Sequence, residues 1–202
     1  MAADVLKRYY KTLTAISILI SVLSVVSGCS GNQTAESRWT DSEIKYYINH
    51  NASDQSVRAI QTAFDSWANE THFSFEYAGR NRAGLKKDGK NTVSFLTQWP
   101  DDIPFGQTAW SRCWYDRKGR IIECDIIFNQ ELARFTSLET NRADSYYIEG
   151  VAVHEIGHMI GLGHSAAASS VMKPESTTEE SWFKGEIDDE TIAMYRELYN
   201  TD

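Results

Sequence analysis

The sequence predicts an α/β fold in one domain, and three features of the chain lead to this expectation. Segments in which apolar and polar residues alternate, as in strands, occur together with segments whose apolar residues recur every three or four positions, as in helices. Most of the strand-like segments precede the last two helix-like segments. The chain has 202 residues, 42% of them hydrophobic, which is enough to enclose a single core.

The first half of the domain is expected to hold strands and one helix. Residues 44–48 alternate in polarity and predict a strand. Ser53 or Asp54 can cap the helix that follows. The apolar face of this helix carries Val57, Ile60, Phe64 and Trp67. Residues 73–77 and 93–95 alternate again, and the polar, glycine-rich segment 79–90 between them predicts a loop.

Residues 109–115 and 121–128 predict the two arms of a hairpin. If Lys118 and Gly119 form the centre of its turn, Cys113 and Cys124 are equally far from that centre and face each other across the arms. Opposed cysteines are close enough for a disulfide, and an exported chain permits one. Two free buried thiols are the alternative.

The second half is expected to hold two helices. One should begin near Asp144 or Ser145, because the apolar residues that follow are typical of a buried helix. Asp188 or Asp189 can cap the last helix. The inward face of the last helix carries Ile192, Tyr195 and Leu198.

The segment 154–164, His-Glu-Ile-Gly-His-Met-Ile-Gly-Leu-Gly-His, carries the candidate site. On a helix, His154 and His158 are one turn apart, so both imidazoles can reach one ion. Gly161 can adopt a positive φ and let the chain turn back, which brings in His164 as a third ligand. Three protein ligands leave one position of a tetrahedral zinc open, as in catalytic sites, and Glu155 can then act on a water there. A core helix with incidental histidines is the alternative.

This segment resembles the metzincin zinc peptidases and, more closely, the matrixins. Ser165 follows the third histidine, as it does in matrixins. Met172, followed by Lys173 and Pro174, is similar to the family's Met-turn, whose methionine lies beneath the three histidines. Matrixins usually have tyrosine at the position of Lys173, so the sequence departs from the family pattern at the wall of the pocket. Taken alone, Met172 is equally compatible with an ordinary core residue.

The resemblance covers about residues 39–200 and implies a zincin-like α+β arrangement. This is a twisted five-stranded sheet, mostly parallel with one antiparallel edge strand, together with three helices. In the family, the edge strand pairs with an extended substrate, and an ordinary hairpin arm is the alternative here. The corresponding segment consists of Gln107, Thr108, Ala109 and Trp110. Trp182 and Phe183 stand where matrixins wall a specificity pocket.

The resemblance also implies a zinc endopeptidase, in which Glu155 is the general base for water activated by Zn²⁺ on the three histidines. A surface zinc-binding module without catalysis and a zinc hydrolase acting on cell-wall peptides are alternatives. The expected partner is a protein or peptide substrate, bound by a monomer. Asp125 and Asn129 are candidate calcium ligands, with ordinary surface roles as the alternative. His50 and His72 are too few to build the second, structural zinc site of many animal matrixins, and we expect them at the surface.

The N-terminus predicts export. Basic residues precede an apolar run at 13–26, and Val26-Ser27-Gly28-Cys29 resembles the cleavage box of bacterial lipoproteins. This resemblance implies a signal peptide at 1–28, a lipid on Cys29, a tether at 29–38 and a catalytic domain at 39–202. An uncleaved anchor is the alternative, and both place the domain outside the cytoplasm. Because Ser30 is not the aspartate that favours inner-membrane retention, we expect the outer membrane or the cell surface.

Composition and spacing exclude two further features. The net charge is −8 and no basic stripe is present, so we expect no nucleic-acid partner. Matrixin zymogens usually carry a propeptide whose cysteine blocks the zinc. The segment between Cys29 and Trp39 contains no cysteine, so we expect no propeptide of that kind.

Overall fold

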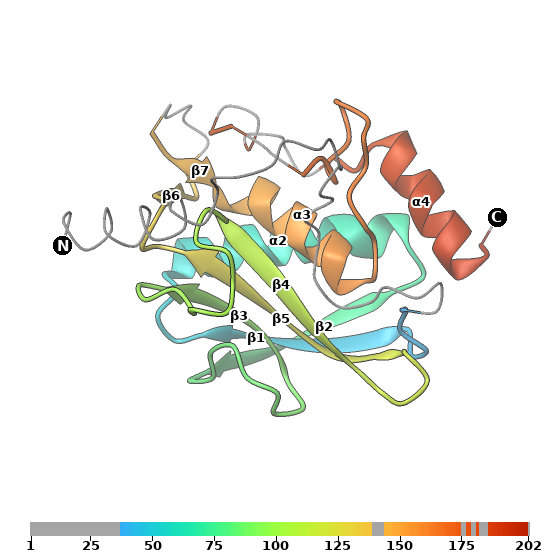
Figure 1. Ribbon diagram of the computed structural model, residues 1–202, viewed down its shortest axis with the longest axis horizontal. Helices are drawn as coiled ribbons and strands as arrows, with labels where there is room; N and C mark the ends of the chain where they lie inside the picture. The colour runs from blue at the N-terminus through green and yellow to red at the C-terminus, as the bar shows by residue number, and fades with distance from the viewer. Residues whose placement is uncertain (1–36, 139–143, 175–176, 179–180, 182–185, 202) are drawn as a thin grey trace, which may run out of the picture.

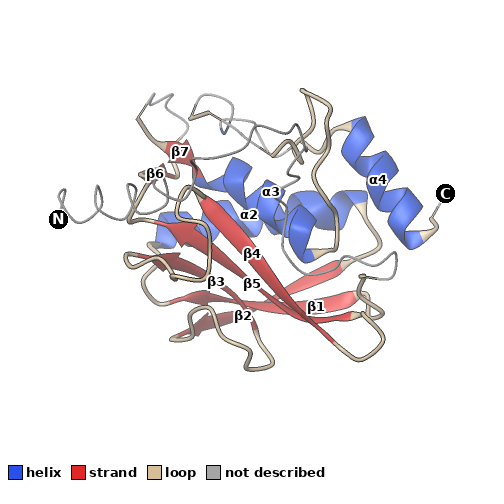
Figure 2. Ribbon diagram, viewed as in Figure 1, coloured by secondary structure: helices blue, strands red, loops and turns tan. Residues whose placement is uncertain are grey.

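The computed structural model describes residues 37–138, 144–174, 177–178, 181 and 186–201. In this part of the chain, helices lie on one side of a five-stranded sheet (Figure 1, Figure 2). The helices are α2 (Asp54–Glu70), α3 (Ile148–Met159) and α4 (Asp189–Tyr199). The strands of the sheet are β1 (Glu43–Asn49), β2 (Ser74–Asn81), β3 (Asn91–Leu96), β4 (Ala109–Tyr115) and β5 (Ile121–Asn129). Two short strands, β6 (Phe135–Thr136) and β7 (Tyr146–Tyr147), form a separate parallel pair.

The sheet has the strand order β2-β1-β3-β5-β4. Strand β1 pairs in parallel with β2 and β3, and β3 pairs in parallel with β5. Strand β4 is antiparallel to β5 because the two are the arms of one hairpin, and it forms an edge of the sheet. The predicted mostly parallel, five-stranded sheet with one antiparallel edge strand is therefore confirmed.

The core lies between the sheet and the helices. The alternation in β1 buries Ile44, Tyr46 and Ile48, as expected for a strand with one covered face. The Tyr46 ring stacks on Phe64 of α2, with 3.7 Å between the ring centroids. Trp67, also on α2, donates from its indole N–H to the Val153 carbonyl oxygen at 2.9 Å and so joins α2 to α3. The amphipathic helix predicted to begin at Ser53 or Asp54 is confirmed, with Ser53 as its N-cap.

Two boundaries differ from the sequence prediction. Helix α3 begins at Ile148 and not near Asp144, because Tyr146 and Tyr147 pair with β6 as a short strand. Strand β2 continues to Asn81 and takes up the first part of the predicted loop. Gly79 has φ +98°, and the register between β1 and β2 shifts beside it, so the strand continues through an irregularity that a glycine accommodates.

The remaining loop, 82–90, is attached to β5 by two buried carboxylates. Glu123 accepts hydrogen bonds from the backbone N–H groups of Asp88 and Gly89, at 2.6 and 2.9 Å. Asp125 accepts from those of Lys86 and Thr92, each at 2.8 Å. Burial raises the pKa of Asp125 to about 7, and the nearby Glu123 and Asp88 add to the rise.

Asp125 and Asn129 are both buried, so the surface roles expected as the alternative to calcium binding are wrong. The side-chain amide N–H of Asn129 donates to the Gln107 carbonyl oxygen at 2.9 Å, and its side-chain oxygen accepts from the Leu132 N–H at 3.1 Å. These bonds give both residues a structural role in holding loops on β5. His50 and His72 are exposed, as predicted.

The predicted signal peptide and the lipidation site, Cys29, lie outside the described residues. No helix in the described part of the chain has both the length and the apolar character needed to cross a membrane.

Candidate metal centre and active site

Helix α3 carries three of the four predicted site residues, His154, Glu155 and His158. The helix ends where Gly161 adopts φ +95°, and the N–H groups of Gly161 and Leu162 donate back to the carbonyls of His158 and Gly157, each at 2.9 Å. This is a glycine C-cap of the Schellman type. A Cβ atom at Gly161 would lie 2.4 Å from the Ser37 carbonyl oxygen, so both the φ angle and the space at this position require glycine.

The reversal after Gly161 brings His164 back to the helix. The Nε2 atom of His158 lies 3.1 Å from Nε2 of His154 and 3.1 Å from Nε2 of His164. Nitrogens bound about 2.0–2.1 Å from a tetrahedral zinc are separated by roughly 3.3 Å, so the observed spacing is close to that of a loaded site. Among the described residues, these three histidines are the set of His, Cys, Asp or Glu side chains whose ligand atoms lie close enough together to share one metal ion.

Backbone carbonyls fix the orientation of two of these rings. Nδ1 of His154 lies 2.6 Å from the Val171 carbonyl oxygen, and Nδ1 of His158 lies 2.8 Å from that of Leu162. A carbonyl only accepts, so the proton of each neutral ring is on Nδ1 and the lone pair of Nε2 points toward the shared position. The residues present therefore fit a metal with imidazole ligands.

The histidines are neutral at pH 7. Burial lowers the pKa of His154 to about 4 and places that of His158 well below its ordinary value. The pKa of His164 is also lowered by burial. Neutral imidazole is the form that binds a metal, so the site is ready to bind one without first losing protons.

The side chain of Glu155 is buried beside the histidines, and burial raises its pKa to about 7. Ser111 of β4 donates from its hydroxyl to Oε2 of Glu155 at 2.7 Å, and this bond acts against the rise. The contact between Ser111 and Glu155 spans 44 positions in the sequence, and no local pattern indicated it.

Met172 is fully buried beneath α3. Gly157 allows this close approach, because a Cβ atom there would lie 2.3 Å from Sδ of Met172 and 3.1 Å from the Trp67 ring. The Ser165 N–H donates to the Met172 carbonyl oxygen at 2.9 Å and closes the segment between His164 and the methionine. Met172 therefore packs against Gly157 of the helix that carries the first two histidines.

Asp188, the N-cap of α4, also holds the backbone of Val171, the residue before Met172. Its Oδ2 atom accepts from the Val171 N–H at 2.8 Å, while its Oδ1 atom accepts from the Thr191 N–H at 3.0 Å. The carbonyl of Val171 in turn holds His154. The sequence left the cap of the last helix between Asp188 and Asp189, and the structure assigns it to Asp188. The link from Asp188 to a histidine was not predicted.

A family model, Matrixin, matches residues 38–200 of this chain. The chain belongs to the matrixin family. Matrixins bind zinc, and the three histidines of this matrixin are arranged to hold it.

Similar proteins include interstitial collagenase of Oryctolagus cuniculus, which is 30% identical over 146 residues, 68% of this chain and 28% of that protein. Matrix metalloproteinase-2 of Drosophila melanogaster is 26% identical over 172 residues, 81% of this chain and 21% of that protein. Metalloendoproteinase 5-MMP of Arabidopsis thaliana is 28% identical over 142 residues, 62% of this chain and 34% of that protein. The matches therefore span about a third or less of these relatives.

The edge strand of this matrixin contains only part of the segment that we predicted to bind substrate. Strand β4 begins at Ala109, so Ala109 and Trp110 belong to it, whereas Gln107 and Thr108 precede it. The Thr108 carbonyl still accepts from the Asn129 N–H at 2.9 Å, which extends the attachment to β5 by one residue. On the helix side of the strand, Ser111 reaches Glu155, so β4 contributes to both the edge and the site.

Cys113 and Cys124 pair directly across β4 and β5 and form a disulfide. The Sγ atom of Cys113 lies 3.9 Å from the carbonyl oxygen of His158. The bridge therefore joins the edge strand to its neighbour directly beside the helix that carries the histidines.

Remote groups also satisfy the carbonyls at the C-terminal end of α3. Trp39 donates from its indole N–H to the Met159 carbonyl oxygen at 2.8 Å, and Tyr199 of α4 donates from its hydroxyl to that of Ile160 at 2.7 Å. These bonds hold the first described residues and the last helix against the end of α3. Trp182 and Phe183, the expected walls of the specificity pocket, lie outside the described residues.

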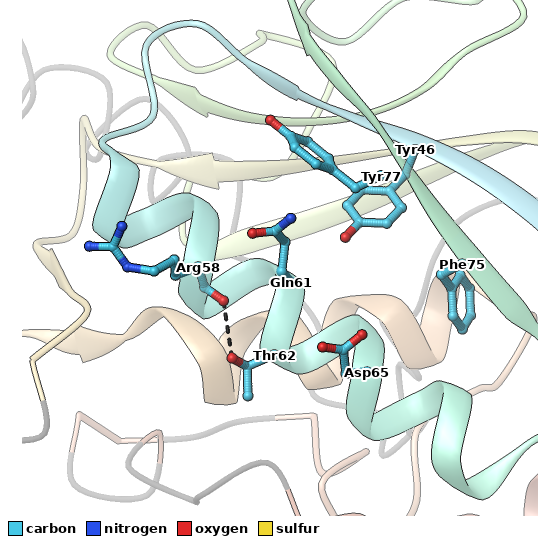
Figure 3. Close-up of a pocket in the computed structure, with 7 residues that line it drawn as sticks. All are labelled: Tyr46, Arg58, Gln61, Thr62, Asp65, Phe75 and Tyr77. Atoms are coloured by element: carbon cyan, nitrogen blue, oxygen red, sulfur yellow. Dashed lines mark hydrogen bonds between the residues drawn. The ribbon is translucent and has the colours of Figure 1, made fainter.

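A hollow lies between α2 and strands β1 and β2, and none of the three histidines lines it (Figure 3). It is lined by Tyr46, Arg58, Gln61, Thr62, Asp65, Phe75 and Tyr77. The Thr62 hydroxyl donates to the Arg58 carbonyl oxygen at 3.1 Å (Figure 3). In the described part of the chain, the side chains that could share a metal ion are those of His154, His158 and His164 and not those of this lining, so the candidate metal site is at the histidines.

Proposed function

We propose that this matrixin is a zinc-dependent endopeptidase that cleaves protein or peptide chains. The observation that carries the proposal is the convergence of three neutral imidazoles beside one buried carboxylate, Glu155. Zn²⁺ held by His154, His158 and His164 would act as a Lewis acid toward a water molecule and a peptide carbonyl. Glu155 directly follows His154 in α3, and its carboxylate can accept and donate a proton beside the three histidines.

Glu155 takes a proton from the attacking water at a carboxylate oxygen and returns it to the leaving amine nitrogen. Its buried position excludes bulk water, so the proton is delivered to the amine and not lost to solvent. The ring orientations set by Val171 and Leu162 keep the three Nε2 atoms in place during this transfer. No covalent bond between the chain and the substrate is required.

The substrate is expected to bind as an extended strand along the open edge of β4. An edge strand offers unpaired N–H and C=O groups, and an added peptide gains main-chain hydrogen bonds there without a requirement for a particular sequence. Ala109 and Trp110 lie at the start of this edge. Specificity then comes from the side-chain pockets on either side of the cleavage point.

We further propose that the enzyme works in the cell envelope, held by a lipid on Cys29. The apolar run at 13–26 followed by Ser27-Gly28-Cys29 supports this location. Labelling cells with a radioactive fatty acid tests it. The wild-type chain should incorporate the label, the Cys29→Ala chain should not, and a wild type without label would contradict the lipid anchor.

The catalytic proposal is tested with purified full-length chain and unfolded casein. Wild type should cleave casein, lose this activity to a chelator and regain it with added zinc. Glu155→Ala should retain zinc but cleave at least about 100-fold more slowly, the usual contribution of a general base. A folded, zinc-loaded wild type that cleaves neither casein nor a peptide library would contradict the proposal and favour a binding module.

A further inference from the structure

Ser111 makes two contacts with the same residue of α3. Its hydroxyl lies 2.7 Å from Oε2 of Glu155 and 2.8 Å from the Glu155 carbonyl oxygen. Ser111 is 3% exposed and Glu155 is 5% exposed, so water competes little for either contact. The hydroxyl has one hydrogen, which these two oxygens share, so β4 is joined to the backbone and the carboxylate of Glu155 at one point.

We propose that Ser111 is a positioning residue for the catalytic base and fixes which carboxylate oxygen serves in proton transfer. This inference rests on the proposed endopeptidase function. A glutamate side chain has three rotatable bonds, and a general base works only within hydrogen-bond reach of the proton that it takes. The hydrogen bond from Ser111 holds Oε2 toward β4 and lowers its basicity, so Oε1 is the oxygen that receives the proton and returns it.

The position of Ser111 in β4 gives this bond a second consequence. Its backbone pairs with Ile126 of β5, and its side chain points to α3. The opposite edge of the same strand is the one along which the proposed substrate lies. One strand therefore sets both the register of the peptide and the orientation of the base, so the distance between Glu155 and the cleaved bond does not depend on a flexible loop.

A purely structural role is the competing explanation, because the same hydroxyl joins β4 to α3. The two roles predict different measurements. If Ser111 only joins the two elements, its removal should lower the melting temperature and zinc affinity, and the loss of activity should persist when Glu155 is absent. If Ser111 positions Glu155, the loss should fall on kcat and vanish in a Glu155→Ala background.

The experiment compares full-length wild type, Ser111→Ala and Ser111→Thr. We expect kcat of Ser111→Ala to fall about 10-fold with KM within about twofold, the effect of losing one hydrogen bond to a charged group. Ser111→Thr keeps a hydroxyl and should recover most of kcat. Ser94→Ala is the matched control, since Ser94 is also a buried sheet serine, bonded to the Ala83 carbonyl at 3.3 Å and not to Glu155, and it should retain wild-type kcat.

Two readouts do not depend on turnover. The zinc dissociation constant, from competition with a chelator, should differ by less than about twofold between wild type and Ser111→Ala. Crystal structures of both zinc-free proteins should show the Glu155 carboxylate in one orientation in wild type and displaced in Ser111→Ala. An active wild type with an equally active Ser111→Ala would overturn the inference and leave the proposed function intact. An inactive wild type would instead overturn the proposed function.

Discussion

At the scale of single residues, the histidines depend on groups that lie far from them in the sequence. His154 is held by the Val171 carbonyl, and the Val171 N–H is held by Asp188. His158 is held by Leu162, within the turn that Gly161 makes possible. Such outer contacts keep each ring in the orientation that a metal requires, so their loss weakens metal binding although they touch no metal.

We predict that Asp188→Ala lowers zinc affinity about 10-fold, because the Val171 carbonyl is then free to move away from His154. Asp188→Ser separates this effect from helix capping. A serine hydroxyl can still accept from the Thr191 N–H, but it is shorter and has one oxygen for two donors. The Asp188→Ser variant should therefore regain the stability of α4 but not the zinc affinity of wild type. Competition with a chelator gives the affinities, and Asp189→Ala, altered at the adjacent residue, should bind zinc as wild type does.

At the scale of the elements, the β4–β5 hairpin carries a covalent restraint beside the site. The disulfide between Cys113 and Cys124 joins the edge strand to the sheet interior, and 11 positions separate the two cysteines. An edge strand has neighbours on one side only, so the bridge replaces part of the support that a second neighbour would give. The pairing also keeps Ser111, two residues before Cys113, directed at α3.

We predict that replacing both cysteines by alanine destabilises the fold by roughly 2–3 kcal/mol, the scale expected for a short closed loop. Urea unfolding of the zinc-free protein measures this difference without a contribution from the metal. A reductant should lower the stability of wild type by a similar amount and leave the double variant unchanged. Equal stability of wild type and variant under oxidising conditions would show that the bridge adds nothing.

The 82–90 loop makes stability depend on pH through Asp125. Its pKa in the fold, about 7, lies above its ordinary value of 3.8. The folded state therefore binds the proton more tightly than the unfolded chain, and the stability that this supplies is complete below about pH 4 and lost as pH rises through 7. Asp125→Asn cannot titrate. Relative to Asp125→Asn, wild type should lose melting temperature between pH 5 and pH 8.

The control for this prediction is Asp88→Asn, in the same loop. Asp88 is exposed, and its side chain accepts a local hydrogen bond from the Lys90 N–H at 3.1 Å. The Asp88→Asn variant should keep the loss of stability that wild type shows as pH rises, with a midpoint moved toward lower pH because one negative charge near Asp125 is removed. If Asp125→Asn and wild type differ by a constant amount from pH 5 to pH 8, then Asp125 does not titrate in that range.

At the scale of the whole molecule, the sequence predicted what depends on neighbouring residues. Periodicity located the sheet strands and α2, and a symmetric hairpin placed Cys113 opposite Cys124. The spacing from His154 to His164 predicted that their side chains would converge. The predicted start of α3, Asp144 or Ser145, is four or three residues too early, because the pairing of β7 with β6 leaves no local signal in the sequence. The contact of Ser111 with Glu155 depends on packing between distant elements and was not predictable in the same way.

Zinc should stabilise the whole fold, because its ligands come together only in the folded chain. His154 and His158 belong to α3, whereas His164 follows the turn and precedes Ser165, whose N–H donates to the Met172 carbonyl oxygen. Binding to the folded state alone, at about 1,000 times the dissociation constant, adds about 4 kcal/mol. For a chain of this size we therefore predict a rise in melting temperature of about 10 °C on zinc addition to the chelated protein. His158→Ala should abolish most of the rise, whereas Glu155→Gln, which keeps all three ligands, should retain it. An equal rise in His158→Ala would show that zinc binds elsewhere.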